Sequence, residues 1–244
     1  MKHAVAISTY ITDVVHTKRL LRCVQSLKNT GYPSDIIIVS DGSDFDGQSE
    51  FWCREIFDDC LFNFKMINTG ISRCKNTCIR VLCSSDFRGA IWNYPIDVGF
   101  LVDDDMEFFE DDWWEHWLCA IDCTGIGHWS WADVKKGGRK LTEKNGYRFE
   151  QTEHLNGSFL TFTPEIIQEV GGFPVSHVKW GWDHVNWTNR IVRAGLAPGY
   201  CDIINSNNYI RLQENAGSAV SKEQRRENRK YEFEEGSIYQ EVIE

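Results

Sequence analysis

Val98-Gly99-Phe100-Leu101-Val102-Asp103-Asp104-Asp105 joins a continuous apolar run to three consecutive aspartates. Such a run is typical of a strand buried on both faces of a parallel sheet. Open parallel sheets bind ligands at the carboxyl ends of their strands, which is where the aspartates fall. Adjacent carboxylates repel one another, and a divalent cation shared with a diphosphate is a natural counter-charge. A solvated acidic loop is the alternative, because further acids follow at Glu107, Glu110, Asp111 and Asp112.

The chain before this strand alternates between short β-rich runs and helical patterns. We expect strands at residues 4–9, 36–39 and 62–67, and a helix at residues 72–82. Thr17 is expected to cap an earlier helix, because apolar residues then recur at three- and four-residue spacing. These residues are Leu20, Leu21, Val24 and Leu27. The β-α-β-α-β order predicts a mostly parallel central sheet with helices on both faces.

The chain after the aspartates is less regular, with helices expected at residues 111–121, 164–170 and 182–193. Most of the ten tryptophans lie here, and we expect most of them to fill the core. From Gln213 onward the composition becomes charged and nearly free of apolar residues. Two basic clusters, at residues 135–140 and 222–230, are expected to be either solvated surfaces or contacts for a phosphate-rich ligand.

Length, charge and cysteine content limit the class of protein. The 244 residues suit one mixed domain, and a formal charge of -10 disfavours a general nucleic-acid binder. No stretch approaches the roughly 20 apolar residues that span a bilayer, and the N-terminus lacks the core of a signal peptide. The nine cysteines contain no C-x-x-C pair. We therefore expect buried, reduced thiols in a cytoplasmic protein.

Two other sites carry carboxylates where chemistry is expected. Asp41 follows an expected strand and precedes Gly42, so it can bind a base or ribose or simply form an Asx turn or helix cap. Asp183 and His184 begin an expected helix, where either residue can act as a general base. An N-cap aspartate beside a structural histidine explains that pair equally well.

These segments together resemble the motifs of the GT-A-fold nucleotide-sugar glycosyltransferases, especially the large family-2 group. The resemblance rests on the order of residues 5–10, 35–43, 68–76, 100–105, 157–173 and 180–193. It implies a GT-A (Rossmann-like) α/β fold, a three-layer α/β/α arrangement with a mostly parallel central sheet. It also implies one GT-A domain at residues 1–212, with a nucleotide-sugar half (1–110), an acceptor half (111–212), and a charged tail or lid at 213–244.

The resemblance assigns donor-binding roles to individual residues. Thr9 and Tyr10 would line the base pocket, Asp41 would bind the base, most often uracil, and Arg73 would approach the base or the diphosphate. Asp103 and Asp105 would form the D-x-D element that holds Mg²⁺ or Mn²⁺, with Asp103 also near the ribose. Asp104 would lie in the nucleotide-sugar site between them.

The catalytic motif departs from the family pattern. Relatives commonly carry two consecutive acids where this chain has Asp183 and His184. We expect Asp183 to be the base and His184 to position substrate, serve as a base or bind the metal, since some relatives use a histidine ligand. Trp180 and Trp182, which flank this motif, are the expected sugar contacts. One displacement at the anomeric carbon would invert its configuration, and a retaining outcome would need a different arrangement.

The expected activity is metal-dependent transfer of a sugar, from a UDP-sugar in most relatives, to an acceptor hydroxyl. The acceptor is expected to be a saccharide, a lipid-linked sugar or a protein, and a modified base in DNA is a further alternative. A nucleotidyltransferase is a second hypothesis, although the lysine-containing glycine-rich loop of such enzymes is missing from residues 6–10. A non-catalytic nucleotide-sugar binder is a third.

Overall fold

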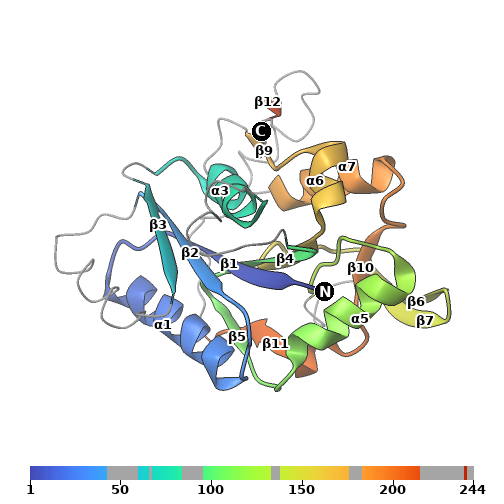
Figure 1. The fold of residues 1–244 in the computed structure, drawn as a ribbon, viewed down its shortest axis with the longest axis horizontal. Coiled ribbons are helices and arrows are strands. Elements are labelled where there is room, and N and C mark those ends of the chain that lie inside the picture. The colour runs from blue at the N-terminus through green and yellow to red at the C-terminus, as the bar shows by residue number, and fades with distance from the viewer. Residues whose placement is uncertain are drawn as a thin grey trace.

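The computed structural model describes residues 1–42, 60–65, 68–83, 96–132, 138–175, 183–214 and 239–240. Its centre is a five-stranded sheet in the order β3-β2-β1-β4-β8 (Figure 1). Strands β1 (His3–Thr9), β2 (Ile36–Asp41), β3 (Leu61–Lys65) and β4 (Val98–Asp103) run parallel, and β8 (Phe159–Phe162) is antiparallel to β4. The mostly parallel sheet predicted from the sequence is therefore confirmed.

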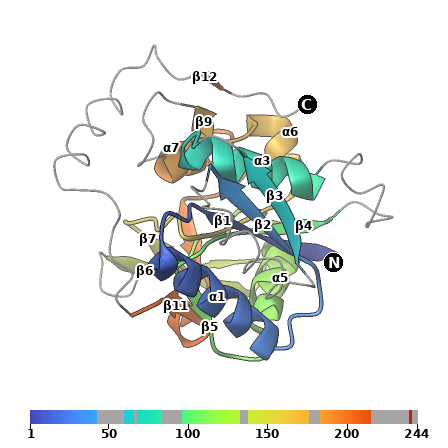
Figure 2. The same ribbon diagram turned by 90° about the vertical axis from the view of Figure 1, so that its left-hand side faces the viewer.

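Helices cover both faces of this sheet. Helices α1 (Val14–Asn29) and α5 (Trp113–Thr124) lie on one face. Helices α3 (Ile71–Cys83), α6 (Pro164–Val170) and α7 (Asp183–Arg193) lie on the other, as Figures 1 and 2 show. The result is the expected three-layer α/β/α arrangement.

Smaller sheets surround this core. Strands β6 (Arg139–Lys144), β7 (Tyr147–Thr152) and β10 (Tyr200–Asp202) form an antiparallel sheet in the order β10-β7-β6. Strand β5 (Met106–Phe108) pairs with β11 (Ile210–Leu212), and β9 (Pro174–Val175) pairs with β12 (Tyr239–Gln240). A single 3₁₀ turn, η1, spans Ser206–Asn208 in the described residues. Because β11 pairs with β5, residues 210–212 hold the segment just after the aspartates.

The start of α1 corrects the prediction that Thr17 caps it. Asp13 is the cap, since its Oδ1 accepts hydrogen bonds from the amides of Val15 and His16 at 2.8 and 2.9 Å. Thr17 lies one turn inside the helix and donates its hydroxyl to the Asp13 carbonyl. The apolar spacing identified the buried face, but exposed polar and apolar residues extend the helix further toward its N-terminus.

Two other element bounds differ from the predictions. Helix α5 begins at Trp113 rather than at residue 111, because Asp112 adopts a left-handed conformation with φ 60°. Strand β3 spans Leu61–Lys65, and residues 66 and 67, which we expected to extend it, lie outside the described part of the chain.

The core is rich in aromatic side chains, as predicted for most tryptophans. Trp113, Trp117, Trp129, Trp131 and Trp187 are all at most 2% exposed. The prediction of buried thiols holds for most described cysteines but is wrong for two: Cys119 and Cys123 are exposed on α5, and their sulfur atoms lie 3.9 Å apart. They occupy the outer face of an amphipathic helix whose inner face is already filled by tryptophans. Among the described residues, no helix is long and apolar enough to cross a membrane.

Strand β4 needs glycine at position 99. A Cβ atom there would overlap the ring of Phe162, the residue that pairs with Gly99 across the β4–β8 ladder. We predict that Gly99→Ala lowers the free energy of unfolding by about 1–3 kcal/mol, the usual range for overpacking a core. Urea denaturation measures this change.

A Gly99→Ala/Phe162→Leu double variant is the control for this overlap. It should lose less stability than the sum of its single variants, because the smaller side chain removes the overlap. Additive losses would contradict this explanation of the glycine.

Candidate functional site at the carboxyl edge of the sheet

The sheet brings together residues that are far apart in the sequence. Thr9, Asp41 and Asp103 are the last residues of β1, β2 and β4. The register pairs Thr9 with Ser40 and Ser8 with Asp103, so the three strand ends lie at one edge. This placement is the one expected for parallel neighbouring strands.

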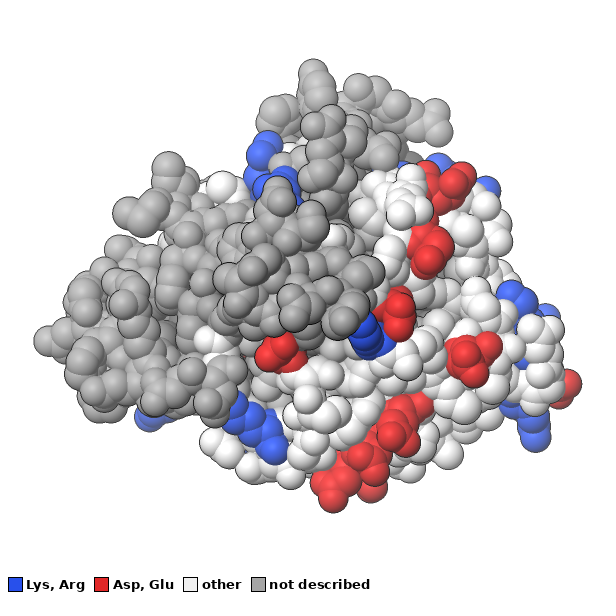
Figure 3. All heavy atoms as spheres, viewed as in Figure 1, with Lys and Arg blue, Asp and Glu red and all other residues white. Residues whose placement is uncertain are grey.

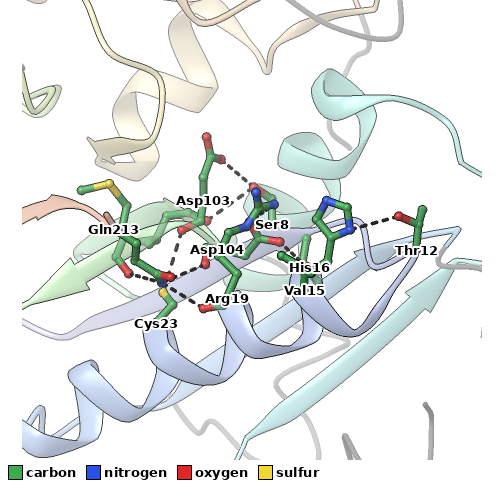
Figure 4. A network of polar contacts seen from close by, with 12 residues as sticks. Ser8, Thr12, Val15, His16, Arg19, Cys23, Asp103, Asp104 and Gln213 are labelled. Carbon is green, nitrogen blue, oxygen red and sulfur yellow. Dashed lines mark hydrogen bonds and ion pairs between the residues drawn. The ribbon is translucent and has the colours of Figure 1, made fainter. Parts of the chain in front are cut away.

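The first two aspartates of the triplet have different partners. Asp103 accepts a hydrogen bond from the Ser8 hydroxyl at 2.9 Å and forms an ion pair with Lys75 at 3.0 Å. Asp104 accepts from the Thr9 hydroxyl at 2.6 Å and pairs with Arg19 of α1 at 2.9 Å. Figure 4 labels Ser8, Arg19, Asp103 and Asp104 of this network, which lie above α1. Asp103 is therefore compensated from the α3 side of the sheet and Asp104 from the α1 side.

Asp105 is compensated more weakly, because the charges of Arg19 and Lys75 only partly offset the effects that raise its pKa. Its Oδ1 is buried and makes no hydrogen bond within the described part of the chain. Burial, with the neighbouring charges of Asp103 and Asp104, raises the pKa of Asp105 from 3.8 to about 7. A buried carboxylate with an unused oxygen beside two other carboxylates provides the chemistry that a hard divalent cation binds. The described residues nevertheless contain no group of three or more His, Cys, Asp or Glu side chains arranged as metal ligands.

Lys75 is a site residue that the sequence analysis did not identify. Its side chain is 2% exposed, and its Nζ donates to the Gly157 carbonyl as well as to Asp103. Burial alone would lower the pKa of Lys75, but the carboxylates of Asp103 and Asp183 outweigh that effect and raise it. The available signal was a lysine on the apolar face of α3, beside Cys74 and one turn before Ile79.

Gln213 also belongs to the site's support, although we expected it to begin a charged tail. Its amide Nε2 donates to the carbonyls of Arg19 at 2.9 Å and Met106 at 3.1 Å. Its backbone N–H donates to the Asp105 carbonyl at 2.7 Å. These bonds join the triplet's backbone to α1 (Figure 4).

The Asp41 carboxylate binds the turn before α3. It accepts hydrogen bonds from the Thr69 hydroxyl at 2.7 Å, from the Thr69 amide at 3.1 Å and from the Gly70 amide at 2.8 Å. These bonds reach residues 28 and 29 positions further along the chain, so they are not the local Asx turn or helix cap considered for Asp41. Its side chain connects the end of β2 to the segment that begins α3.

Asp183 and His184 begin α7, as the sequence predicted. The Oδ2 atom of Asp183 is buried and has no hydrogen-bond partner in the described residues. Burial lowers the pKa of His184, although Asp183 opposes this shift, so its imidazole is neutral near pH 7. Gly157 allows the imidazole to approach the backbone, since a Cβ at this position would lie 2.6 Å from His184 Cγ.

A pocket lies between the end of β4 and the start of α7. It encloses about 210 Å³ and is lined by Lys75, Asp103, His184 and the loop 154–158. The structure thus brings the end of β4 and the start of α7 to one pocket, which the sequence predicted only through the family resemblance. His154, Asn156 and Ser158 are lining residues that the sequence analysis did not single out.

The remaining expected site residues are not among those that line this pocket. Tyr10 is half-buried just after β1, and Arg73 is exposed on the first turn of α3. Trp180 and Trp182 lie outside the described residues, as do residues 135–137 of the basic loop and the whole basic cluster at 222–230.

No protein-family model matches the chain. An uncharacterized glycosyltransferase of Acanthamoeba polyphaga mimivirus is 32% identical over 219 residues, covering 87% of this chain and 81% of the relative.

Two solved structures show the same fold. S. aureus TarS 1–349 in complex with UDP-GlcNAc matches 89% of this chain with a TM-score of 0.56 and 13% identity. The mannosyltransferase PcManGT of Pyrobaculum calidifontis, solved with GDP-Man and Mn²⁺, matches 78% with a TM-score of 0.53 and 14% identity. The chain spans 60% and 51% of these two solved chains, respectively.

The raised pKa of Asp105 makes stability depend on pH. The stability that its protonated form contributes is fully present below the unfolded pKa of 3.8 and is lost as pH rises through about 7. Asparagine cannot ionise, so Asp105→Asn should melt above the wild type by a margin that grows over this range and then levels off. Thermal unfolding without divalent cations measures the margin.

Asp122→Asn is the matched control for this measurement, because Asp122 is exposed on α5. Its melting temperature should differ from that of the wild type by the same amount at every pH. A similarly flat difference for Asp105→Asn would contradict a buried, protonated Asp105.

Proposed function

The chain belongs to the glycosyltransferases and has their GT-A fold, and from this premise we propose that it transfers a sugar from a UDP-sugar to an acceptor hydroxyl, aided by Mn²⁺ or Mg²⁺. The observation that carries the proposal is the shared pocket of Asp103, at the end of β4, and His184, beside Asp183 at the start of α7. Because the chain belongs to this family, we propose sugar transfer instead of nucleotidyl transfer or non-catalytic binding of a nucleotide-sugar.

The donor occupies the carboxyl edge of the sheet in this proposal. The proposed nucleotide-binding residues lie at the ends of two strands: Thr9 ends β1, Tyr10 follows it, and Asp41 ends β2. Arg73 lies three residues after Gly70, whose amide donates to Asp41. UDP-GlcNAc is the donor bound in the TarS structure, whereas GDP-Man is bound in PcManGT. We assign UDP to this chain on the family resemblance of its base-binding segment.

Asp103 and Asp105 are the proposed metal ligands. The buried Oδ1 of Asp105 has no partner in the described residues, and the triplet carries more acid than Arg19 and Lys75 neutralise. When bound, the cation would neutralise the donor diphosphate and make it a better leaving group. Mn²⁺ in the PcManGT structure supports a divalent cation of this kind. His184 is a further candidate ligand from the other side of the pocket.

Asp183 is the proposed general base. Its Oδ2 is buried and makes no hydrogen bond with a described residue, and the side chain lies in the first turn of α7. The acceptor hydroxyl gives its proton to this oxygen while it attacks the anomeric carbon. The neutral imidazole of His184 can accept or donate a hydrogen bond and so orients the substrate. A single displacement of this kind inverts the configuration.

Thermal unfolding with nucleotides and nucleotide-sugars tests the donor and the metal together. A donor at a hundredfold excess over its dissociation constant adds about 2.7 kcal/mol of stability. We predict that one nucleotide family raises Tm by about 5–10 °C, and only when Mn²⁺ or Mg²⁺ is present.

The metal role is tested by two variants in the same assay. Asp105→Ala should lose the metal-dependent part of the shift, while Asp122→Ala on the surface of α5 should keep it. Equal shifts with and without the cation would contradict the metal role, and no shift with any nucleotide would contradict the donor site.

Substitution of the base separates chemistry from donor binding. Asp183→Asn removes the proton acceptor without changing shape, so we predict a fall in kcat of about 10²–10⁴-fold. The dissociation constant for the donor should stay within a factor of a few. Glu165→Gln, an exposed acid in the first turn of the neighbouring α6, is the matched control and should leave kcat unchanged. An Asp183→Asn enzyme with normal turnover would contradict this assignment.

A further inference from the structure

Helix α1 has a charge pattern opposite to that of the whole chain. Its sixteen residues contain Lys18, Arg19, Arg22 and Lys28 and no Asp or Glu. The chain has 36 acids in 244 residues, so an average stretch of sixteen would hold two or three. Figure 3 shows Lys and Arg side chains at the lower left, where α1 lies in Figure 1, and acidic side chains over the centre and bottom of the same view.

The outer face of α1 also carries apolar side chains. Val14 and Val15 are each 66% exposed, more than any other large apolar side chain in the described residues. Val14, Lys18 and Arg22 follow one another at four-residue spacing, and Val15 is three residues before Lys18, so all four lie on one helix face. Figure 2 shows α1 on the outside of the molecule.

The basic charge of this face is only partly compensated. Arg19 is paired with Asp104, and the Asp13 carboxylate contacts the Val15 and His16 amides and the His16 ring. Glu107 is the acid beside Arg22 at 3.0 Å, but Arg211 also approaches it at 3.6 Å. One carboxylate is thus shared by two guanidinium groups, and Lys18 adds a further exposed positive charge.

We propose that the outer face of α1, formed by Val14, Val15, Lys18 and Arg22, docks the protein on an anionic membrane surface. Basic residues near an anionic bilayer are attracted to its headgroups, and valine side chains gain free energy by entering the interface. The two valines favour a bilayer over a nucleic acid, since phosphate contacts need only the basic residues.

The rest of the molecule determines the orientation of this contact. A net charge of -10 repels an anionic surface from other directions, so the basic helix face is the one that approaches it. The inner face of α1 is fixed in the core by Leu20, Cys23, Val24 and Leu27, which are all buried. The helix begins five residues after β1 ends, so the carboxyl edge of the sheet would lie close to the membrane. The docking itself does not depend on the proposed sugar transfer.

Vesicle sedimentation of the full chain tests the docking. The protein should sediment with vesicles of phosphatidylcholine and phosphatidylserine, less with phosphatidylcholine alone, and less as salt rises. Lys18→Gln with Arg22→Gln should weaken binding about fivefold for each basic residue removed. Val14→Ser with Val15→Ser should weaken it about tenfold. All four residues are exposed, so the variants should unfold at nearly the wild-type temperature.

Lys140→Gln with Lys144→Gln is the matched control, because both residues are exposed on β6, away from α1. This variant carries the same charge change and should bind vesicles as the wild type does. The proposal is overturned if the wild type ignores anionic vesicles, if it binds neutral vesicles equally, or if the α1 variants bind unchanged. Retention on heparin without vesicle binding would also overturn it, in favour of a soluble polyanion.

Discussion

The candidate site depends on one interaction, the ion pair between the buried ammonium group of Lys75 and the Asp103 carboxylate. Lys75 lines the pocket, pairs with Asp103 and donates to the carbonyl of Gly157. Its charge also acts on Asp183 at the start of α7. Three segments that are distant in the sequence therefore meet at one cation, whose charge is shared by half-buried Asp103 and buried Asp183.

The two helical layers divide the charge of the triplet between them. Arg19 reaches Asp104 from α1, and Lys75 reaches Asp103 from α3 on the opposite face of the sheet. Asp103 is the last residue of β4, whereas Asp104 lies in the turn that follows, and each finds its partner on a different face of the sheet. Asp105 is left with a buried oxygen that no described residue satisfies.

Much of the fold could be predicted because apolar spacing is a local property. The continuous run before Asp103 forms the buried strand β4, and helix α6 begins at Pro164 and ends at Val170 as expected. The errors arose where a local feature competes with the pattern. Asp13 rather than Thr17 caps α1, and the left-handed Asp112 delays the start of α5. The exposure of Cys119 and Cys123 depends on which face of α5 the tryptophans fill, which the spacing of the cysteines alone does not indicate.

The sequence by itself determined that acidic residues would collect at one edge of a parallel sheet, since strands that run in one direction place their ends together. It also determined that Asp183 and His184 would begin a helix. Only the tertiary structure decided which cation compensates which carboxylate, and that Lys75 is buried among them. The physical reason is that these pairs join residues far apart in the chain. The packing of α1 and α3 against opposite faces of the sheet brings them into contact, and no local spacing encodes it.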